Sequence, residues 1–499
     1  MGESARPHSN GVDEPLIRAD VAVIGAGGAG LYTALSAARE GARVALVSAT
    51  PLAQTASYWA QGGLAAALAA DDSPAQHLAD TLRAGRAAVR RSAAEVLVTE
   101  APERVRDLQS LGVRFDADRN GRLALGLEGG HSVRRVAHAG GSATGRRVVR
   151  QLSAIAVQEP GITVFEGARA GSLWLTDGVC RGLVCEDGRR ISARAVVLCT
   201  GGSAALWART TNPPGSQGSG LILAHAAGAT LADLEFAQFH PTAVIDVPGR
   251  EGFLITEAIR GEGATLLDAS GQRFVDELAP RDEVARAIWA KLAETGARSV
   301  GLDMRGIDEA SFPNVFSALR EAGVDATREL VPVAPAAHYM MGGIVTDLNG
   351  RSSVPGLYAV GETACTGLHG ANRLASNSLS ECFVFGWRAA HRSLSEPLPA
   401  PPNQAELDAL VDRTPLPTPG PDTRTALWRH AGLERSAEGL RLLLDDPYPL
   451  ARLIAASALA REETRGAHMR IDHPERDPEL DYRHAVLAAN GELHWEHWL

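Results

Sequence analysis

Short hydrophobic runs alternate with helical spacing in the first 50 residues of the chain. An apolar run over residues 20–24 ends at Gly25, and apolar positions three or four apart then follow over residues 31–38. Residues 43–47 return to the continuous apolar character of a buried strand. The pattern predicts a strand, a helix and a second strand, in the length that a parallel βαβ crossover needs.

Two later runs, residues 195–202 and 356–362, are also strand-like and reach glycines. Because the carboxyl ends of parallel strands meet at one edge of a sheet, we expect both to border the same ligand crevice. The long stretch between them contains an amphipathic segment over residues 281–295. This arrangement predicts a second domain inserted into the first.

The C-terminal fifth of the chain has a different character. Proline-rich segments over residues 396–403 and 414–421 are typical of a linker, and helical spacing follows over residues 440–444 and 450–459. We therefore expect an α/β protein built of three parts: a Rossmann-like, doubly wound nucleotide-binding domain (residues 1–230 and 340–400), an inserted α+β capping domain (residues 231–339) and a helical C-terminal domain (residues 401–499).

The composition is globular, with an acidic balance. The 499 residues include 49 basic and 59 acidic side chains, which gives a net charge of −10. An acidic chain lacks the positive footprint that nucleic acids and anionic membranes require, so we expect neither as a partner. One local basic cluster has no aromatic residues between its members, and we interpret it as a solvated face or a flank of an active-site loop: Arg134, Arg135, Arg146, Arg147 and Arg150.

The cysteines and the N-terminal residues indicate the cellular location that we expect. The five cysteines form no CxxC pair, which indicates neither a disulfide framework nor a metal or iron–sulfur site. Residues 1–20 resemble neither a signal peptide nor an anchor, and no segment has the roughly 18 consecutive apolar residues of a membrane span. We expect a cytoplasmic protein.

A glycine-rich turn follows the first predicted strand. The sequence Gly25-Ala26-Gly27-Gly28-Ala29-Gly30 fits GxGxxG in its proper context, between a strand and a helix. Its glycines permit a tight turn, a close approach of backbone to a pyrophosphate and close packing of helix on strand. The end of the second strand reads Val47-Ser48-Ala49 and lacks the usual acidic residue for a ribose, which weakens a generic NAD-binding interpretation. The motif predicts a dinucleotide, and an ordinary tight turn is the alternative.

Six tracts occur in order along the chain: residues 60–63 (AQGG), 238–242 (QFHPT), 256–263 (TEAIRGEG), 279–282 (APRD), 336–343 (AAHYMMGG) and 361–362 (GE) with 367–379 (GLHGANRLASNSL). Together they resemble the flavoprotein superfamily of succinate dehydrogenases and fumarate reductases, and within it most closely the L-aspartate oxidase family. The resemblance runs over about residues 20–392 and more loosely over 461–468.

The resemblance implies that FAD is the cofactor. At five residues before Gln61, where many relatives carry a histidine bonded to the flavin, this chain has Ala56, which implies noncovalent FAD. Ala49 and Ser219 stand where relatives often have lysine and aspartate. The residues that the resemblance and the glycine motif assign to FAD are Gly25, Gly27, Gly28, Ala29, Gly30, Ser48, Ala56, Ser57, Tyr58, Trp59, Ala60, Gln61, Gly62, Gly63, Glu362, Ser378 and Leu379.

The resemblance also implies a site for a dicarboxylate that carries an amine. Glu128 matches a glutamate near the substrate amine, and an ammonium group needs such a carboxylate partner. A solvated loop glutamate is the alternative. Arg373 is suited to hold one carboxylate with two parallel hydrogen bonds, and the remaining residues assigned to the dicarboxylate are His240, Thr256 and His338.

Arg281 matches the proton-transferring residue of the superfamily. General chemistry favours a histidine or glutamate in that role, because a guanidinium group is effectively always protonated. Glu257 and Arg260 match residues that conduct protons to this arginine in fumarate reductases, and their spacing of three places them on one face of a helix. Arg281, Glu257 and Arg260 are therefore the candidate catalytic group.

The implied activity is FAD-dependent oxidation of L-aspartate to iminoaspartate, with oxygen or fumarate as electron acceptor. This is the first step of de novo NAD (quinolinate) biosynthesis, which implies a functional link to quinolinate synthase. A soluble fumarate reductase or succinate dehydrogenase flavoprotein is the nearest alternative, which Ala56 and Glu128 disfavour. A flavin-carrying interaction subunit without catalysis is the alternative of another class, which the full set of site residues disfavours.

Overall fold

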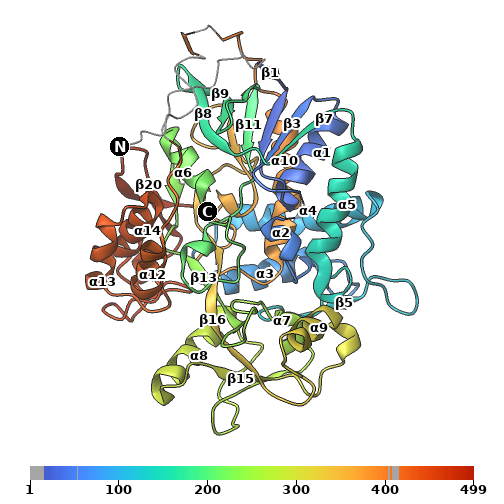
Figure 1. Ribbon diagram of the computed structural model, residues 1–499, viewed down its shortest axis with the longest axis vertical. Helices are drawn as coiled ribbons and strands as arrows, with labels where there is room; N and C mark the ends of the chain where they lie inside the picture. The colour runs from blue at the N-terminus through green and yellow to red at the C-terminus, as the bar shows by residue number, and fades with distance from the viewer. Residues whose placement is uncertain (1–15, 53, 403–404, 407–414) are drawn as a thin grey trace, which may run out of the picture.

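A computed structural model of the chain describes residues 16–52, 54–402, 405–406 and 415–499. The first 15 residues, on which the expectation of no leader segment largely depends, lie outside the described residues, as do residues 403 and 414 of the predicted linker. A body with two sheet layers occupies the upper half of the molecule, a capping region lies below it, and the C-terminal region packs against one side of the body (Figure 1). The predicted domain limits stay predictions.

A parallel sheet of five strands forms the centre of the body. Its order places the first predicted strand, β2, between the second, β3, and the strand predicted near residue 195, β11, so the βαβ prediction is confirmed. Consecutive residues of β2 enter two different hydrophobic cores, since Val21 and Val23 pack on one face and Ala22 and Ile24 on the other. Both faces are therefore covered, as a parallel sheet requires. In order the strands are β18 (Leu357–Ala359), β11 (Ala195–Leu198), β2 (Val21–Ile24), β3 (Val44–Ser48) and β7 (Ile162–Glu166).

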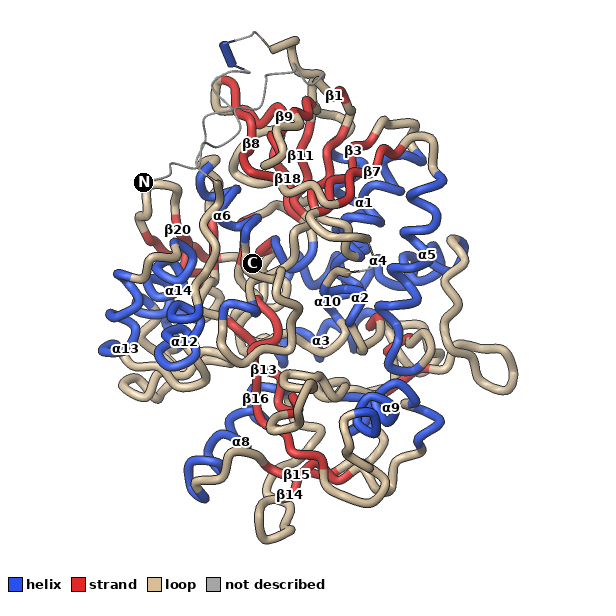
Figure 2. Tube along the Cα trace, in the orientation of Figure 1, coloured by secondary structure: helices blue, strands red, loops and turns tan. Residues whose placement is uncertain are grey.

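Helices cover one face of this sheet, and a second sheet covers the other (Figure 2). The second sheet contains β1 (Ile17–Arg18), β10 (Arg190–Ser192), β9 (Val179–Cys185) and β8 (Ala170–Thr176). A small sheet of β4 (Leu64–Ala65), β6 (Val136–Ala137) and β5 (Leu125–Gly126) lies beside the helices. The helices of the body are α1 (Gly28–Arg39), α2 (Ala56–Trp59), α3 (Pro74–Ala84), α4 (Arg91–Ser110), α5 (Thr144–Gln158), α6 (Ser219–Ala226) and α10 (Asn377–Ser393).

The capping region has its own antiparallel sheet and its own hydrophobic core. It joins the body through two neighbouring strands, β13 (Ala237–Val244) and β16 (Val331–Met340), which run from the body into the cap (Figure 1). β15 (Val300–Asp303) and β14 (Thr265–Leu267) complete the sheet. Its helices are α7 (Glu257–Gly261), α8 (Arg281–Thr295) and α9 (Pro313–Glu321), and α8 matches the predicted amphipathic segment.

The C-terminal region contains the predicted helices and two strands that the prediction missed. Its helices are α12 (Pro421–His430), α13 (Ala437–Leu442) and α14 (Pro449–Ala460). β20 (Arg483–Leu487) and β21 (Leu493–His497) extend a sheet that also contains β12 (Leu231–Ala232), β17 (Gly343–Val345) and β19 (Ala364–Cys365). Because these strands come from the far end of the chain, periodicity within the C-terminal segment could not locate their partners. The C-terminal region is thus built into the base of the cap.

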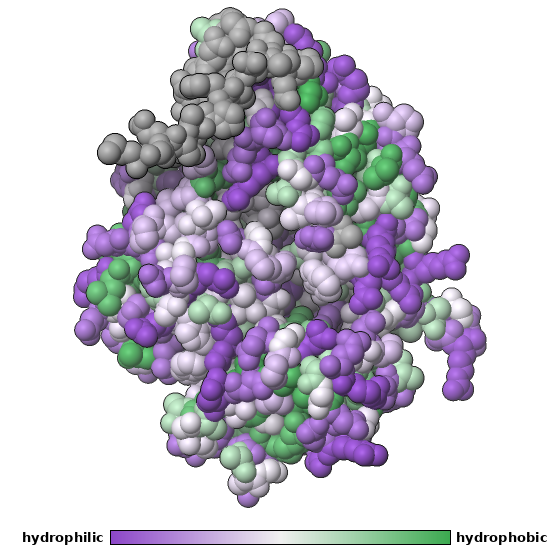
Figure 3. All heavy atoms as spheres, in the orientation of Figure 1, coloured by the Kyte–Doolittle hydropathy of each residue, from purple (hydrophilic) through white to green (hydrophobic). Residues whose placement is uncertain are grey.

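The surface, the helices and the metal-ligating side chain types add three observations. On the face drawn in Figure 3, hydrophilic residues predominate over both the cap and the body, with hydrophobic residues in smaller groups. Within the described part of the chain, no helix combines the length and apolar character needed to cross a membrane. The same residues contain no group of three or more histidine, cysteine or acidic side chains placed to hold a metal ion.

Candidate active site

A cavity of about 810 Å³ lies where the carboxyl ends of the central strands face the cap. Its body side is formed by the glycine-rich turn after β2, by the α2 turn and by the loop after β11. Its cap side is formed by side chains from β13, α7 and α8. The volume is at the upper end of the range for ligand sites in proteins, which suits an extended ligand with a small molecule beside it.

The glycine-rich turn is shaped to approach a phosphate. Gly25 has φ +105°, a conformation that favours glycine, and a Cβ on Gly30 would stand 1.8 Å from the carbonyl oxygen of Gly25. Gly27 precedes α1 without any side-chain cap, so the first N–H groups of the helix are left without a side-chain partner. Free N–H groups and the positive end of the helix dipole suit a pyrophosphate. These residues fit the dinucleotide that the motif predicts.

Most residues predicted to contact FAD line the cavity. Gly28, Gly30 and Tyr58 do not: Gly30 packs on Gly25, and the ring of Tyr58 lies beneath the guanidinium group of Arg150. Their role as FAD contacts stays a prediction. The predicted residues on the lining are Gly25, Gly27, Ala29, Ser48, Ala56, Ser57, Trp59, Ala60, Gln61, Gly62, Gly63, Glu362, Ser378 and Leu379, and the two departures, Ala49 and Ser219, lie there too.

Arg281 and Arg373 line the cavity and are bridged by the amide of Gln238, which lies outside the cavity lining. Nη1 of Arg281 and Nη2 of Arg373 each donate a hydrogen bond of 3.1 Å to Oε1 of Gln238. The amide nitrogen of Gln238 donates to Oδ1 of Asn372 at 2.9 Å and to the carbonyl oxygen of Arg373, also at 2.9 Å. One neutral side chain therefore holds two guanidinium groups at a fixed spacing. Such a pair of cations suits a dianionic ligand.

The Arg373 guanidinium keeps donor capacity for that ligand. Nη1 donates to Oγ of Ser378 at 2.8 Å, while Nε is buried and has no hydrogen-bond partner among the described residues. Cζ of Arg373 lies 4.3 Å from the ring centroid of Tyr339. This cation–π contact stabilises the positive charge of the guanidinium group. Burial and the neighbouring Arg281 lower the pKa of Arg373 to about 10, so it remains cationic at neutral pH.

The two predicted histidines lie side by side, with ring centroids 5.0 Å apart. Nδ1 of His240 accepts a hydrogen bond from the N–H of Thr242 at 3.2 Å, which leaves the proton on Nε2. That Nε2 is buried and has no partner within the described chain. Nδ1 of His338 lies 2.8 Å from Oγ1 of Thr211. Burial and the charge of Arg281 hold the pKa of both histidines well below the ordinary value, so both are neutral hydrogen-bonding groups.

Glu128 brings a carboxylate to the same cavity. It is 1% exposed and receives a hydrogen bond of 2.6 Å from Oγ of Ser376 on its Oε2. Ser376 has φ +60°, a strained conformation for a residue other than glycine, and its hydroxyl also accepts from the N–H of Gly63 at 3.0 Å. The second carboxylate oxygen of Glu128 is buried and has no hydrogen-bond partner among the described residues. Nε2 of His138 lies 3.6 Å from this oxygen, beyond hydrogen-bond distance, so the oxygen can accept from a donor on a ligand. The alternative of a solvated loop glutamate is wrong.

Arg281, Glu257 and Arg260 form the predicted chain of contacts, which leads from the lining of the cavity into the cap. Nε of Arg281 donates to Oε2 of Glu257 at 2.7 Å, and Nη2 of Arg260 donates to Oε1 at 2.8 Å. α7 places Glu257 and Arg260 on one face, as their spacing predicts. Burial alone would raise the pKa of Glu257, but Arg281 and Arg260 outweigh it and hold the pKa below its ordinary value. Glu257 is therefore ionised between two guanidinium groups. Arg260 does not line the cavity itself.

Thr256 completes the set from the cap side. It lines the cavity, is 3% exposed and stands at the N-terminal cap position of α7. The structure thus brings Glu128, His240, Thr256, His338 and Arg373 to one cavity with Arg281, although their positions span more than 240 residues of sequence. Their roles in substrate binding stay predictions.

For Arg135 of the basic cluster, the structure excludes a solvated face and fits the other interpretation, a flank of the active-site loop. Arg135 belongs to no solvated face, because its side chain is fully buried and pairs with Asp72 at 2.9 Å and with Asp80 at 2.6 Å. Asp80 also accepts hydrogen bonds from the backbone and hydroxyl of Ser132. The buried pair fixes the loop that carries Glu128. An arginine in a run of arginines gave no sign of burial, since its acidic partners lie 55 and 63 residues away.

Comparison with known proteins places the chain in a family. The FAD binding domain family matches residues 20–379, and the C-terminal family of fumarate reductase flavoproteins matches residues 440–497. An L-aspartate oxidase of Caulobacter vibrioides is 46% identical, over 91% of this chain and 94% of that protein. The L-aspartate oxidase of Streptomyces coelicolor is 42% identical, over 95% and 92%. The chain belongs to the L-aspartate oxidase family.

Solved structures similar to this member of the L-aspartate oxidase family include chains of a fumarate reductase and of Sdh1. The quinol fumarate reductase of E. coli is 29% identical and superposes with a TM-score of 0.88 over 97% of both chains. A Mycobacterium smegmatis Sdh1 chain, solved in complex with UQ1, is 32% identical, with a TM-score of 0.80 over 94% of this chain and 92% of that one. These findings confirm FAD as the cofactor and the Rossmann-like fold with a cap and a C-terminal domain.

Proposed function

We propose that this chain oxidises L-aspartate to iminoaspartate with bound FAD, and passes the electrons to oxygen or fumarate. The observation that carries the proposal is the buried Oε1 of Glu128, which has no hydrogen-bond partner among the described residues and has only Nε2 of His138 near it, at 3.6 Å, in a cavity that two arginines also line. A dicarboxylate without an amine can occupy the site but offers no hydrogen-bond donor to this buried oxygen. An amino dicarboxylate supplies the missing ammonium. The identity with L-aspartate oxidases over most of the chain supports the same activity.

In the proposed complex, the chain binds and orients the substrate. Arg373 holds one carboxylate with its free Nε and the adjacent guanidinium nitrogen, while His240 donates its Nε2–H to the other. Thr256 and His338 flank the same carboxylate. Glu128 accepts the ammonium hydrogen bonds and thereby fixes which carbon faces the flavin. Fixed geometry of this kind lowers the barrier because the reacting atoms need no further alignment.

The bound flavin supplies the redox chemistry, in that it accepts the two electrons lost when the substrate C–N bond becomes C=N. The chain manages charge and protons around that step. Arg281 lines the cavity and contacts Glu257, which contacts Arg260, so a proton taken or given by Arg281 has an ionised carboxylate directly behind it. This relay reduces the difficulty that a guanidinium group is a poor base. The cap excludes water from the site.

A flavin spectrum tests the proposal directly. Anaerobic addition of L-aspartate to the FAD-loaded protein is expected to bleach the flavin absorbance band, and succinate is expected to leave it unchanged. Bleaching by succinate alone would instead support a succinate dehydrogenase or fumarate reductase. No bleaching by either dicarboxylate would support a non-catalytic flavin-carrying subunit. The first outcome is expected because only aspartate provides a cation for Glu128.

The fumarate reductase alternative is favoured by one observation, the close superposition on the E. coli enzyme. Fumarate fits the same site as an electron acceptor, since it offers two carboxylates to Arg373 and His240. Ala56 on the cavity lining has no nucleophile for a covalent flavin bond, which supports noncovalent FAD. A functional link to quinolinate synthase and a cytoplasmic location are further parts of the proposal.

A further inference from the structure

We propose that Arg86 is a positioning residue for Arg281, and that the C-terminal region holds Arg86 in place. This inference deepens the proposed function and rests on it, because it concerns the same reaction. Arg86 lies in the body, between α3 and α4, whereas Arg281 is the first residue of α8 in the cap. The two are joined by the side chain of Asp282.

The side chains of the first two residues of α8, Arg281 and Asp282, point to different places. Arg281 lines the cavity, while the carboxylate of Asp282 is 1% exposed and contacts Arg86 outside it. Nε and Nη2 of Arg86 each donate to one oxygen of Asp282 at 3.1 Å. α8 has no side-chain cap at its N-terminus. Nη2 of Arg86 also donates to Oε1 of Glu283, so Arg86 holds the first turn of the helix through two carboxylates, next to the residue that must be placed accurately.

The backbone of Arg86 has a conformation that arginine rarely adopts without support from its surroundings. Arg86 has φ +57° and Ala87 has φ +55°, so two consecutive residues other than glycine are left-handed. Such a conformation persists only where surrounding contacts impose it. Here Nη1 of Arg465 donates to the carbonyl oxygen of Arg86 at 2.7 Å, and the N–H of Tyr482 donates to that of Ala87 at 2.7 Å. Both donors belong to the C-terminal region.

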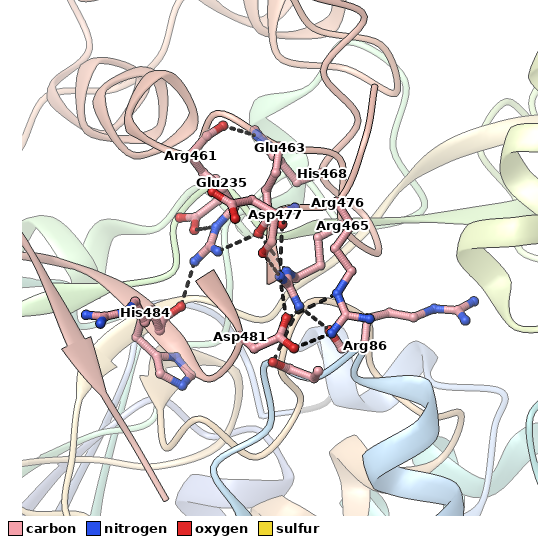
Figure 4. Close-up of polar contacts among 12 residues, drawn as sticks. Arg86, Glu235, Arg461, Glu463, Arg465, His468, Arg476, Asp477, Asp481 and His484 are labelled. Atoms are coloured by element: carbon pink, nitrogen blue, oxygen red, sulfur yellow. Dashed lines mark hydrogen bonds and ion pairs between the residues drawn. The ribbon is translucent and has the colours of Figure 1, made fainter. Parts of the chain in front are cut away.

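Arg465 is itself held by a buried ionic network (Figure 4). Glu463 accepts from Nε of Arg465 at 2.6 Å and from Nη2 at 2.9 Å, and its Oε1 also accepts from Arg461 at 3.0 Å. Arg461 in turn donates to Glu235 at 2.6 Å. These side chains are fully buried. Because Glu235 lies just before β13, the network connects the base of the strand that carries His240 to the loop that carries Arg86.

Arg286 makes a second connection between Asp282 and the C-terminal region. Arg286, one turn along α8, donates to Oδ2 of Asp282 at 3.2 Å and to the carbonyl oxygen of Gly466 at 2.8 Å. Asp282 therefore lies where the body, the cap and the C-terminal region meet. Loss of the Arg86 contact would leave a buried carboxylate with one cation in place of two, and the start of α8 would move to compensate. Arg281 would move with it, while Arg373 and His240 would not.

The test is a split between kcat and KM. Arg86→Gln in the FAD-loaded full chain is expected to lower kcat for L-aspartate by about tenfold to a hundredfold, because small misplacements of a reacting group have effects of that size. KM is expected to stay within about threefold, since the carboxylate-binding residues are untouched. Arg86→Lys, which keeps the charge, is expected to recover part of the lost kcat. The control is Arg91→Gln, whose arginine is 61% exposed and pairs with Glu95 within α4.

Each outcome either supports or overturns the positioning role of Arg86. An unchanged kcat in Arg86→Gln, or a loss that Arg86→Lys does not relieve, would overturn the proposal, and so would a fall in kcat that only follows loss of bound FAD. If Arg86→Gln does not fold, Asp282→Asn is measured against the same criteria. If the unsubstituted protein reduces fumarate but does not oxidise aspartate, the proposed function fails. The effects of Arg86→Gln on kcat and KM are then measured for fumarate reduction, which uses the same Arg281.

Discussion

Replacement of Glu128 by glutamine tests the residue that distinguishes an amino dicarboxylate from a simple one. Glutamine keeps the shape of the side chain and can still accept the hydrogen bond from Ser376, but it loses the negative charge. The carboxylate is buried, and one of its oxygens has no hydrogen-bond partner in the described chain, so the substrate ammonium would meet an almost fully desolvated partner. The change therefore removes the charge that would face the ammonium, together with any attraction to His138, whose Nε2 lies 3.6 Å from the same carboxylate.

The expected magnitude follows from that burial. Removing one member of a buried, hydrogen-bonded charge pair costs about 2–5 kcal/mol. At about 1.4 kcal/mol per factor of ten, kcat/KM for L-aspartate should fall roughly 30- to 3000-fold. Fumarate has no ammonium group, so its reduction, measured with a chemically reduced flavin dye as donor, should change by less than about threefold. The same substitution thus has unequal effects on two substrates of one site.

The assay compares both activities in Glu128→Gln and in Glu95→Gln. Glu95 is a matched control because its side chain is 49% exposed and pairs with Arg91 along one helix. Flavin content is measured for each variant, so that a loss of cofactor is not mistaken for a loss of recognition. Equal losses of aspartate oxidation and fumarate reduction would refute the reasoning, because Glu128 would then support the cavity and not the amine.

Three further predictions concern the cofactor and stability. Acid precipitation should release all of the FAD into the supernatant, because Ala56 offers no atom for a covalent bond; yellow colour retained in the pellet would contradict this. Gly30→Ala should abolish FAD binding and lower the melting temperature, because the new Cβ would stand 1.8 Å from the carbonyl oxygen of Gly25; an FAD-loaded variant of normal stability would show that the turn can open. The free energy of unfolding should fall as the pH is lowered from 7.5 to 5. Burial lowers the pKa of His77 to about 3 and holds the pKa of His468 well below its usual value. In the unfolded chain both histidines have pKa values near 6.5, so the unfolded chain binds protons that the folded chain does not. Chemical denaturation at several pH values would measure this, and a flat profile would contradict it.

The sequence was most informative where chemistry depends on neighbouring residues. The turn from Gly25 to Gly30 combines strand, turn and helix within one short segment, and the contact of Glu257 with Arg260 follows from a spacing of three. Both could be predicted because the interacting groups are close in sequence. The βαβ unit was predicted for the same reason.

Long-range contacts were beyond such reasoning. Gln238 lies in a tract that the resemblance includes, but its role as a bridge depends on Arg281 and Arg373, which are 43 and 135 residues away. A neutral amide carries no charge pattern that would single it out. The left-handed conformation of Ser376 is likewise imposed by distant partners, since its hydroxyl bonds to Glu128 and Gly63. For such residues only the assembled fold reveals the function.

The attachment of the cap through β13 and β16 determines the order of events at the site. His240 and His338 lie on these two strands, beside Arg373 of the body, whereas Arg281 begins a helix that only the cap carries. A rotation of the cap about the strands would displace Arg281 and leave the histidines close to the axis, where movement is smallest. A dicarboxylate could then dock on a preassembled half-site while the cap is open, and the complete set of groups would exist only after closure. Capture of the substrate and commitment to chemistry would therefore be separate events in time.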